Sequence, residues 1–181
     1  NETTKYYLRA IEGGNIDAVY NYAKLLYNGE DRGKNIKKIA NLYKKAAEGG
    51  DARSMYEYSY FLEKGIVFEI DLKSSLSYLK KSAEMGYKNA ILIYGLKIGD
   101  DEKNEAIKIY KNNAIKGNIY SIRMYASEIR KTCKYEAFCW YRIAADSGDV
   151  ESMINYAQMA FIGECFPPDK VEALRYFKKA A

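Results

Sequence analysis

The stretch EAFCWYRIAADSG, Glu136–Gly148, carries the pattern that decides the fold, because parts of it recur along the whole chain. Each copy has a pair of residues, usually small, then two variable residues and a glycine. The glycines are Gly14, Gly50, Gly86, Gly117 and Gly148, with spacings of 36, 36, 31 and 31 residues. A fixed period of this length indicates an array of repeated supersecondary units.

The residues before each glycine form a helical stripe, which we name helix B. The seventh residue before the glycine is Tyr7, Tyr43, Leu79, Tyr110, Tyr141 and, in the incomplete last unit, Phe177. The eighth is Tyr6, Leu42, Tyr78, Ile109, Trp140 and Tyr176. Together with the small pair, these offsets of three, four and seven share one helix face.

The residues after each glycine form a second stripe, helix A. The eighth residue is a tyrosine in every repeat, namely Tyr22, Tyr58, Tyr94, Tyr125 and Tyr156. Positions four and nine are always small, and positions five and twelve are apolar. The stripe therefore predicts a buried helix face, with the tyrosines and Trp140 filling the gaps between neighbouring hairpins.

Each repeat is thus expected to be helix A, a loop, helix B and a glycine that ends the helix in the left-handed conformation. Asp51, Asn118 and Asp149 are natural N-caps for the next helix. Differences in repeat length are expected in the loop after helix A, around GEDRGKN at Gly29 and GIVFEID at Gly65.

The predicted fold is an all-α solenoid of about five helical hairpins, with roughly eleven helices in one array over residues 1–181. Its units are residues 1–14 (partial), 15–50, 51–86, 87–117, 118–148 and 149–181 (incomplete). We expect a fragment of a longer chain, because the sequence begins without Met and stops in a helical stretch. The sequence indicates neither a compartment nor an oligomeric state.

The composition removes most catalytic chemistry. The 181 residues include no histidine, which excludes Ser-His-Asp and Cys-His catalysis and His-ligated metals. Three cysteines cannot form a zinc site of four thiolates, and no phosphate-binding loop is present. We therefore expect no cofactor, no metal and no enzyme activity; a hydrolase would need a pair of carboxylates facing one pocket.

The charge pattern argues against nucleic acid as a partner. There are 29 basic and 24 acidic residues, a net charge of +5, but the two signs are interspersed and no basic block stands out. No apolar run approaches the roughly 18 to 20 residues of a membrane span, so direct membrane insertion is not expected either.

Two local features allow more than one interpretation. Cys133 and Cys165 fall in similar loops of successive repeats, so a disulfide between them is compatible with the pattern, but three free thiols, with Cys139, are favoured. The acidic run Asp100, Asp101 and Glu102 could bind a cation; capping of the following helix explains it more simply.

The repeat resembles the Sel1-like repeat, a relative of the tetratricopeptide repeat, over nearly the whole chain. Glu136–Gly148 is most similar, since it supplies the Ala, the Trp-Tyr pair, the Ala-Ala pair and the glycine in register. Tyrosine at position eight departs from the usual leucine. A strict tetratricopeptide array, with a 34-residue period, is the weaker alternative. The resemblance implies a right-handed superhelix with A helices on the concave side.

It also implies an adaptor that binds a protein or peptide. The positions free to specialise are then the seventh and tenth residues after each glycine, which we name the ladder positions. The seventh residues are Asn21, Glu57, Ile93, Met124 and Asn155, and the tenth are Lys24, Tyr60, Leu96, Ser127 and Gln158.

In this hypothesis Asn21 and Asn155 form hydrogen bonds with backbone amides of the partner, and the Tyr60 ring is an anchor residue. Ile93, Leu96 and Met124 form an apolar centre of the binding surface or, alternatively, belong to the hydrophobic core. The first interpretation is a non-enzymatic interaction scaffold. The alternative is a secreted recognition module that binds a host glycoprotein or a cell-wall component, which a Cys133–Cys165 disulfide would favour.

Overall fold

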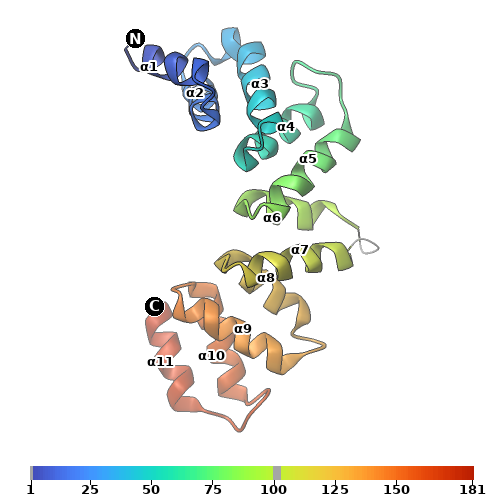
Figure 1. Ribbon diagram of the computed structural model, residues 1–181. Coiled ribbons are helices and arrows are strands. Elements are labelled where there is room, and N and C mark those ends of the chain that lie inside the picture. The colour runs from blue at the N-terminus through green and yellow to red at the C-terminus, as the bar shows by residue number, and fades with distance from the viewer. Residues whose placement is uncertain (1, 100–102) are drawn as a thin grey trace. The chain divides into compact units, whose positions relative to one another are not determined.

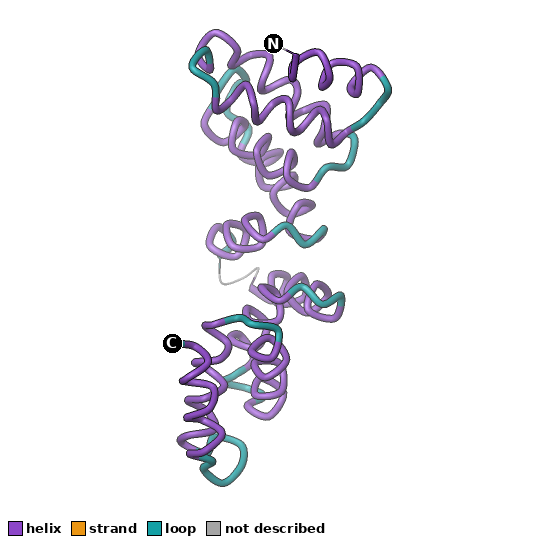
Figure 2. Tube along the Cα trace, turned by 90° about the vertical axis from the view of Figure 1, so that its left-hand side faces the viewer, coloured by secondary structure: helices purple, strands orange, loops and turns teal. Residues whose placement is uncertain are grey.

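The protein is helical throughout the part of the chain that the computed structural model describes, residues 2–99 and 103–181 (Figure 1). Figure 2 shows these helices joined by loops, with no strand among the described residues. The helices are α1 (Glu2–Glu12), α2 (Ile16–Asn28), α3 (Arg32–Glu48), α4 (Ala52–Lys64), α5 (Leu72–Glu84), α6 (Lys88–Lys97), α7 (Lys103–Ile115), α8 (Ile119–Ile129), α9 (Lys134–Asp146), α10 (Val150–Ile162) and α11 (Lys170–Ala180). The all-α solenoid that the sequence predicts is confirmed.

The chain divides into two compact blocks, residues 1–97 and 98–181, which we name the N-terminal and C-terminal blocks. The boundary falls inside the third repeat, so that α6 belongs to the first block and α7 to the second. Within each block, helices that follow one another in the chain pack side by side, from α1 to α6 and from α7 to α11. Each block is therefore a stack of helix A and helix B in alternation.

The glycine at the end of each helix B has the predicted left-handed conformation. The φ angles of Gly14, Gly50, Gly86, Gly117 and Gly148 lie at 81°, 93°, 87°, 84° and 94°. At the end of the unit 118–148, for example, Gly148 N–H donates to Ala145 O at 3.1 Å and Asp149 N–H donates to Ala144 O at 3.0 Å. The small pair before the glycine thus supplies the two carbonyls that this turn caps.

The residue after the glycine caps the next helix, as predicted for Asp51, Asn118 and Asp149. Their side chains accept hydrogen bonds from the backbone N–H groups of the residues three positions later, at 2.7, 2.9 and 3.0 Å. Asn15 makes the same contact in the first repeat. In the third repeat the residue after the glycine is Tyr87, whose ring packs edge-on against the Tyr56 ring at a centroid distance of 5.5 Å.

The core consists of the residues that the two stripes predict. Positions four, five and eight of helix A are buried in every repeat, including all five tyrosines of position eight. In the N-terminal block, the rings of Tyr43 and Phe61 lie 6.0 Å apart, and both belong to one cluster with Ile39 and Leu62. Helix formation and burial therefore follow from the same periodic pattern.

The tyrosines of position eight make contacts beyond the expected ones between neighbouring hairpins. The tyrosine of position eight packs on helix B of its own hairpin, not only between hairpins. Three repeats form the same edge-on pair, Tyr58 with Tyr78, Tyr125 with Trp140, and Tyr156 with Tyr176, at centroid distances of 5.0, 6.0 and 4.7 Å. Tyrosines of position eight also contact the preceding hairpin, as Tyr156 does with Phe138 at 4.6 Å and Tyr22 with Tyr7 at 6.1 Å.

Differences in repeat length are not confined to the loops. Residues Arg32–Asn35 of the GEDRGKN segment belong to α3, which has 17 residues where α5 has 13. Ile36 is packed against the core cluster, so extending the helix helps to bury it. Helix A is also shorter in the third and fourth repeats, with 10 and 11 residues. The acidic run Asp100, Asp101 and Glu102 lies outside the described residues.

Candidate partner-binding surface

The ladder positions lie on the A helices and stay accessible. Asn21 and Lys24 are on α2, Glu57 and Tyr60 on α4, and Ile93 and Leu96 on α6, all in the N-terminal block; Met124 and Ser127 are on α8, and Asn155 and Gln158 on α10, in the C-terminal block. None of these ten residues is buried. Leu96 is 74% exposed and Tyr60 is 41% exposed, so Leu96 is not part of the core.

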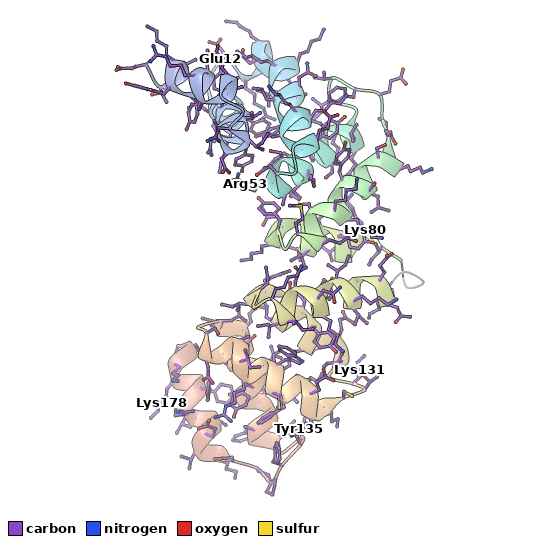
Figure 3. The ribbon with its side chains drawn as sticks, in the orientation of Figure 1. Glu12, Arg53, Lys80, Lys131, Tyr135 and Lys178 are labelled. Atoms are coloured by element: carbon purple, nitrogen blue, oxygen red, sulfur yellow. The ribbon has the colours of Figure 1, made fainter. Side chains whose placement is uncertain are left out.

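Side chains connect the three A helices of the N-terminal block. Arg53 of α4, labelled in Figure 3, forms an ion pair with Asp17 of α2, and its guanidinium lies 4.3 Å from the centre of the Tyr20 ring. Between α4 and α6, Lys97 Nζ lies 2.8 Å from a carboxylate oxygen of Glu63. The ladder positions of α2, α4 and α6 therefore belong to one connected set of helices.

Glu57 is the most unusual ladder residue. Its side chain is half-buried, and this burial raises the pKa of its carboxyl group, an effect that the positive charge of Lys24 opposes. Among residues 2–99 and 103–181, Glu57 has neither a hydrogen bond nor an ion pair. By contrast, Glu63 on the same helix has its pKa lowered by a hydrogen bond from Lys97.

The charge of Glu57 acts on tyrosines from several elements. Burial raises the pKa values of Tyr43, Tyr56 and Tyr87, and the negative charge of Glu57 raises each of them further. Tyr43 lies on α3, Tyr56 on α4 and Tyr87 just before α6, so the phenol groups come from three repeats. The sequence analysis missed these neighbours. Only Tyr56 had a signal outside the aligned stripes, since tyrosine occupies position six in the first two repeats, at Tyr20 and Tyr56.

The apolar ladder residues sit on α6. Leu96 has an exposed neighbour, Leu92, one helical turn earlier and 40% exposed, and Ile93 between them is half-buried. On α4, the Tyr60 ring packs edge-on against the buried ring of Phe61 at 6.4 Å, which leaves its outer surface accessible. The N-terminal block therefore offers polar, charged and apolar ladder side chains on successive A helices.

In the C-terminal block, Asn155 is held by its neighbours. Its Nδ2 donates to Glu151 O at 2.8 Å, and its Oδ1 accepts from Arg130 Nη1 at 3.3 Å. Arg130 in turn donates to both carboxylate oxygens of Glu164, at 3.3 and 2.5 Å, which lowers the pKa of Glu164. The Asn155 amide keeps one N–H and one lone pair for a ligand, in a fixed orientation.

Hollows in the surface lie next to these helices. One, of about 490 Å³, lies between α1 and α2 and includes Asn21 and Tyr7 in its wall. Another, of about 180 Å³, lies in the C-terminal block between Phe138, Tyr156 and the loop at Phe166. The described part of the chain contains no group of three or more residues suited to hold a metal ion.

The three cysteines are free in the structure. This agrees with the favoured expectation of free thiols, and the Cys133–Cys165 disulfide is not formed. The charge of Cys139 contributes to the raised pKa of Cys165, after burial and Glu164, so Cys139 is a near neighbour of that thiol. Within the described residues, no helix has both the length and the apolar content needed to cross a membrane.

Comparison with known families finds one match. The Sel1 repeat matches residues 16–51, 52–87, 134–149 and 150–181, which together make up more than half of the chain. No curated protein matches the chain.

Solved structures with the same arrangement of helices are known. A Sel1 repeat protein from Oxalobacter formigenes has a TM-score of 0.73 and 25% identity, over 97% of this chain and 76% of that one. A protective antigen present in uropathogenic Escherichia coli strains, which displays an SLR fold, has a TM-score of 0.69 and 24% identity over 97% of this chain. This chain spans only 40% of that antigen's length. An immunity protein from Pseudomonas aeruginosa has a TM-score of 0.54 and 18% identity, over 92% of this chain and 65% of that one. The last two likenesses concern the fold alone.

Proposed function

The chain belongs to the Sel1 repeat family, and we propose that it is a non-enzymatic scaffold whose A helices bind a protein or peptide through their ladder positions. Repeats of this family commonly act as protein-interaction modules, and proteins built from them are generally non-enzymatic scaffolds. The proposal adds to this family property a particular surface and a set of residues.

One observation carries the proposal. Positions four, five and eight of helix A are buried in every repeat, whereas the ladder positions are never buried. The accessible set also includes large apolar side chains such as Tyr60 and Leu96. Exposed apolar residues at a repeated position favour contact with a partner over contact with water alone.

The side chains suggest how an extended segment would be held. The Asn21 amide has a donor and an acceptor for backbone groups, and the flat ring of Tyr60 gives a rigid anchor at low entropic cost. Leu96 and Ile93 would contact apolar side chains of the partner. In the C-terminal block, the fixed amide of Asn155 would lose little conformational entropy on binding.

The alternative of a secreted recognition module has no specific observation in its favour. The disulfide that would have supported it, between Cys133 and Cys165, is not formed. We therefore retain the scaffold as the proposed function.

Affinity capture with mass spectrometry, from extracts of the source organism, tests this proposal. The ladder variant carries Asn21→Ala, Tyr60→Ala and Leu96→Ala. The matched control changes the same residue types at exposed positions of B helices, Asn41→Ala, Tyr135→Ala and Leu174→Ala.

We expect a partner that the wild type and the control retain and the ladder variant loses, with all three proteins melting alike. Equal retention by all three proteins would refute the ladder positions as the working surface of the N-terminal block. A second variant, Asn155→Ala with Gln158→Ala, examines the C-terminal block in the same way.

A further inference from the structure

The carboxylate of Glu57 is half-buried and has no partner in the described part of the chain. Among the described residues it accepts no hydrogen bond and forms no ion pair. Taking a carboxylate out of water without compensation is costly, so such groups are normally paired. The neighbouring acids follow this rule, since Asp51 binds Arg53 at 2.6 Å and Glu63 binds Lys97 at 2.8 Å.

Arg53 and Lys24 do not neutralise the charge of Glu57. Arg53 is held by Asp17 and Asp51, and these hydrogen bonds raise the pKa of its guanidinium. Lys24 is near enough for its charge to act on Glu57, but its exposed side chain extends over the Tyr20 ring, with Nζ 5.9 Å from the centroid, and is not ion-paired to Glu57. Neither cation therefore forms an ion pair with the Glu57 carboxylate.

The surroundings of Glu57 suit a group with several N–H donors. Tyr56 precedes Glu57 on α4, and its ring packs edge-on against the Tyr87 ring at 5.5 Å. Burial raises the pKa values of these two tyrosines and of Tyr43, and the charge of Glu57 raises each of them further. Hydroxyl oxygens accept hydrogen bonds, and tyrosine rings attract cations. An ammonium or guanidinium group could thus donate to the carboxylate and to a phenol oxygen at once.

We infer that Glu57, with the tyrosines around it, is the subsite for one lysine or arginine side chain of the bound partner. The inference rests on the proposed function, because it assigns a chemistry to one position of the same ladder. The occupant follows from charge complementarity: a partly desolvated carboxylate attracts a cation more strongly than a fully hydrated one does. Asn21 and Tyr60, on either side in the ladder, would hold the flanking peptide.

A random dodecapeptide library displayed on phage provides the probe. Peptides selected on the wild-type protein are synthesised and labelled, and their dissociation constants are measured by fluorescence polarisation. The variants are Glu57→Gln, the matched control Glu63→Gln on the same helix, and the ladder variant Asn21→Ala, Tyr60→Ala, Leu96→Ala. Circular dichroism confirms that each variant is folded.

We expect peptides that depend on the ladder residues to share a lysine or arginine. Glu57→Gln should weaken their binding by about tenfold or more, as should citrulline or norleucine in place of the basic residue, and the two changes combined should cost little more than one. Glu63→Gln should have no such effect.

The possible failures are distinguishable. If the peptides depend on Asn21, Tyr60 and Leu96 but share no basic residue and ignore Glu57→Gln, the subsite is refuted and the proposed function stands. If no peptide is selected, or if selected peptides ignore the ladder variant, both the subsite and the proposed surface are wrong.

Discussion

The fourth residue after the repeat glycine allows a test in which the same substitution has opposite effects. Ser54, Ser121 and Ser152 occupy this position, and all three are fully buried. Ser152 Oγ donates to a carboxylate oxygen of Asp149 at 2.6 Å. The hydroxyls of Ser54 and Ser121 have no hydrogen-bond partner among residues 2–99 and 103–181. Replacement by alanine should therefore stabilise the protein at residues 54 and 121 and destabilise it at residue 152.

The magnitudes follow from the contacts. A buried polar group without a partner costs about 1 to 3 kcal/mol, and alanine is a better helix former than serine by up to about 0.5 kcal/mol. Ser121→Ala should then raise the free energy of unfolding by about 1 to 3 kcal/mol. Ser152→Ala removes a hydrogen bond to a charged group, of about 1.5 to 3 kcal/mol, less the gain in helix propensity. It should lower the free energy of unfolding by about 1 to 3 kcal/mol.

Urea denaturation followed by far-ultraviolet circular dichroism measures these differences. Ser121 and Ser152 both lie in the C-terminal block, so one transition reports on both. The corresponding shifts in Tm are about 2 to 4 °C per kcal/mol for a chain of this size. Ser54→Ala repeats the test in the N-terminal block. If Ser121→Ala destabilises the protein as much as Ser152→Ala does, the hydroxyl of Ser121 has a partner and the reasoning is wrong.

Glu57→Gln is expected to raise the free energy of unfolding at pH 8 but not at pH 4. Burial raises the pKa of Glu57 in the folded state above its ordinary value. The stability of the wild type therefore falls as the pH rises from the ordinary pKa of a glutamate through the raised pKa of Glu57 in the folded protein. Urea titrations at both pH values check this, and a loss of stability at pH 8 would contradict it. Gly163→Ala should destabilise more than Gly148→Ala in the same assay. Both residues have positive φ, which costs about 1 to 2 kcal/mol for alanine, but only at residue 163 would a Cβ lie 2.8 Å from a backbone oxygen and a proline ring. Equal losses would rule out the steric contribution. Burial and the hydrogen bond to Asp146 raise the pKa of Tyr176 to about 12 in the folded protein. In the unfolded chain the Tyr176 hydroxyl loses its proton from about pH 10, so the stability of the wild type should fall between pH 10 and 12. Tyr176→Phe should show less of this fall, and identical profiles would refute the assignment.

The repeat made most of the fold predictable, because its signals are local and reinforce one another. The tyrosine of position eight, the small pair and the terminal glycine each recur at fixed offsets, and a helix buries those offsets together. Errors arose where tertiary packing overrode a local signal. Gly33 suggested a loop, but it lies in the first turn of α3, where glycine costs less than in the interior, and Ile36 packs on the core.

The candidate surface was only partly predictable. Its positions follow from the register, since residues next to a buried stripe remain accessible. Its chemistry does not, because it depends on contacts between repeats. Glu57 becomes unusual only when packing half-buries its carboxyl group and so raises its pKa, and Asn155 is fixed only because Arg130 reaches it from the loop after α8. No spacing within one repeat indicates such convergence.

The strongest argument for the ladder positions is that they combine exposed apolar side chains with a half-buried carboxylate. The accessible face of a helix normally carries charged or polar residues, which cost nothing to hydrate. Here that face has Leu96 and Tyr60 exposed, and it has a half-buried Glu57 without a partner among the described residues. Neither feature helps the fold, since apolar exposure contributes no burial and an unpaired carboxylate reduces stability. Local choices that oppose stability are expected at functional positions, where a partner supplies what the isolated chain lacks.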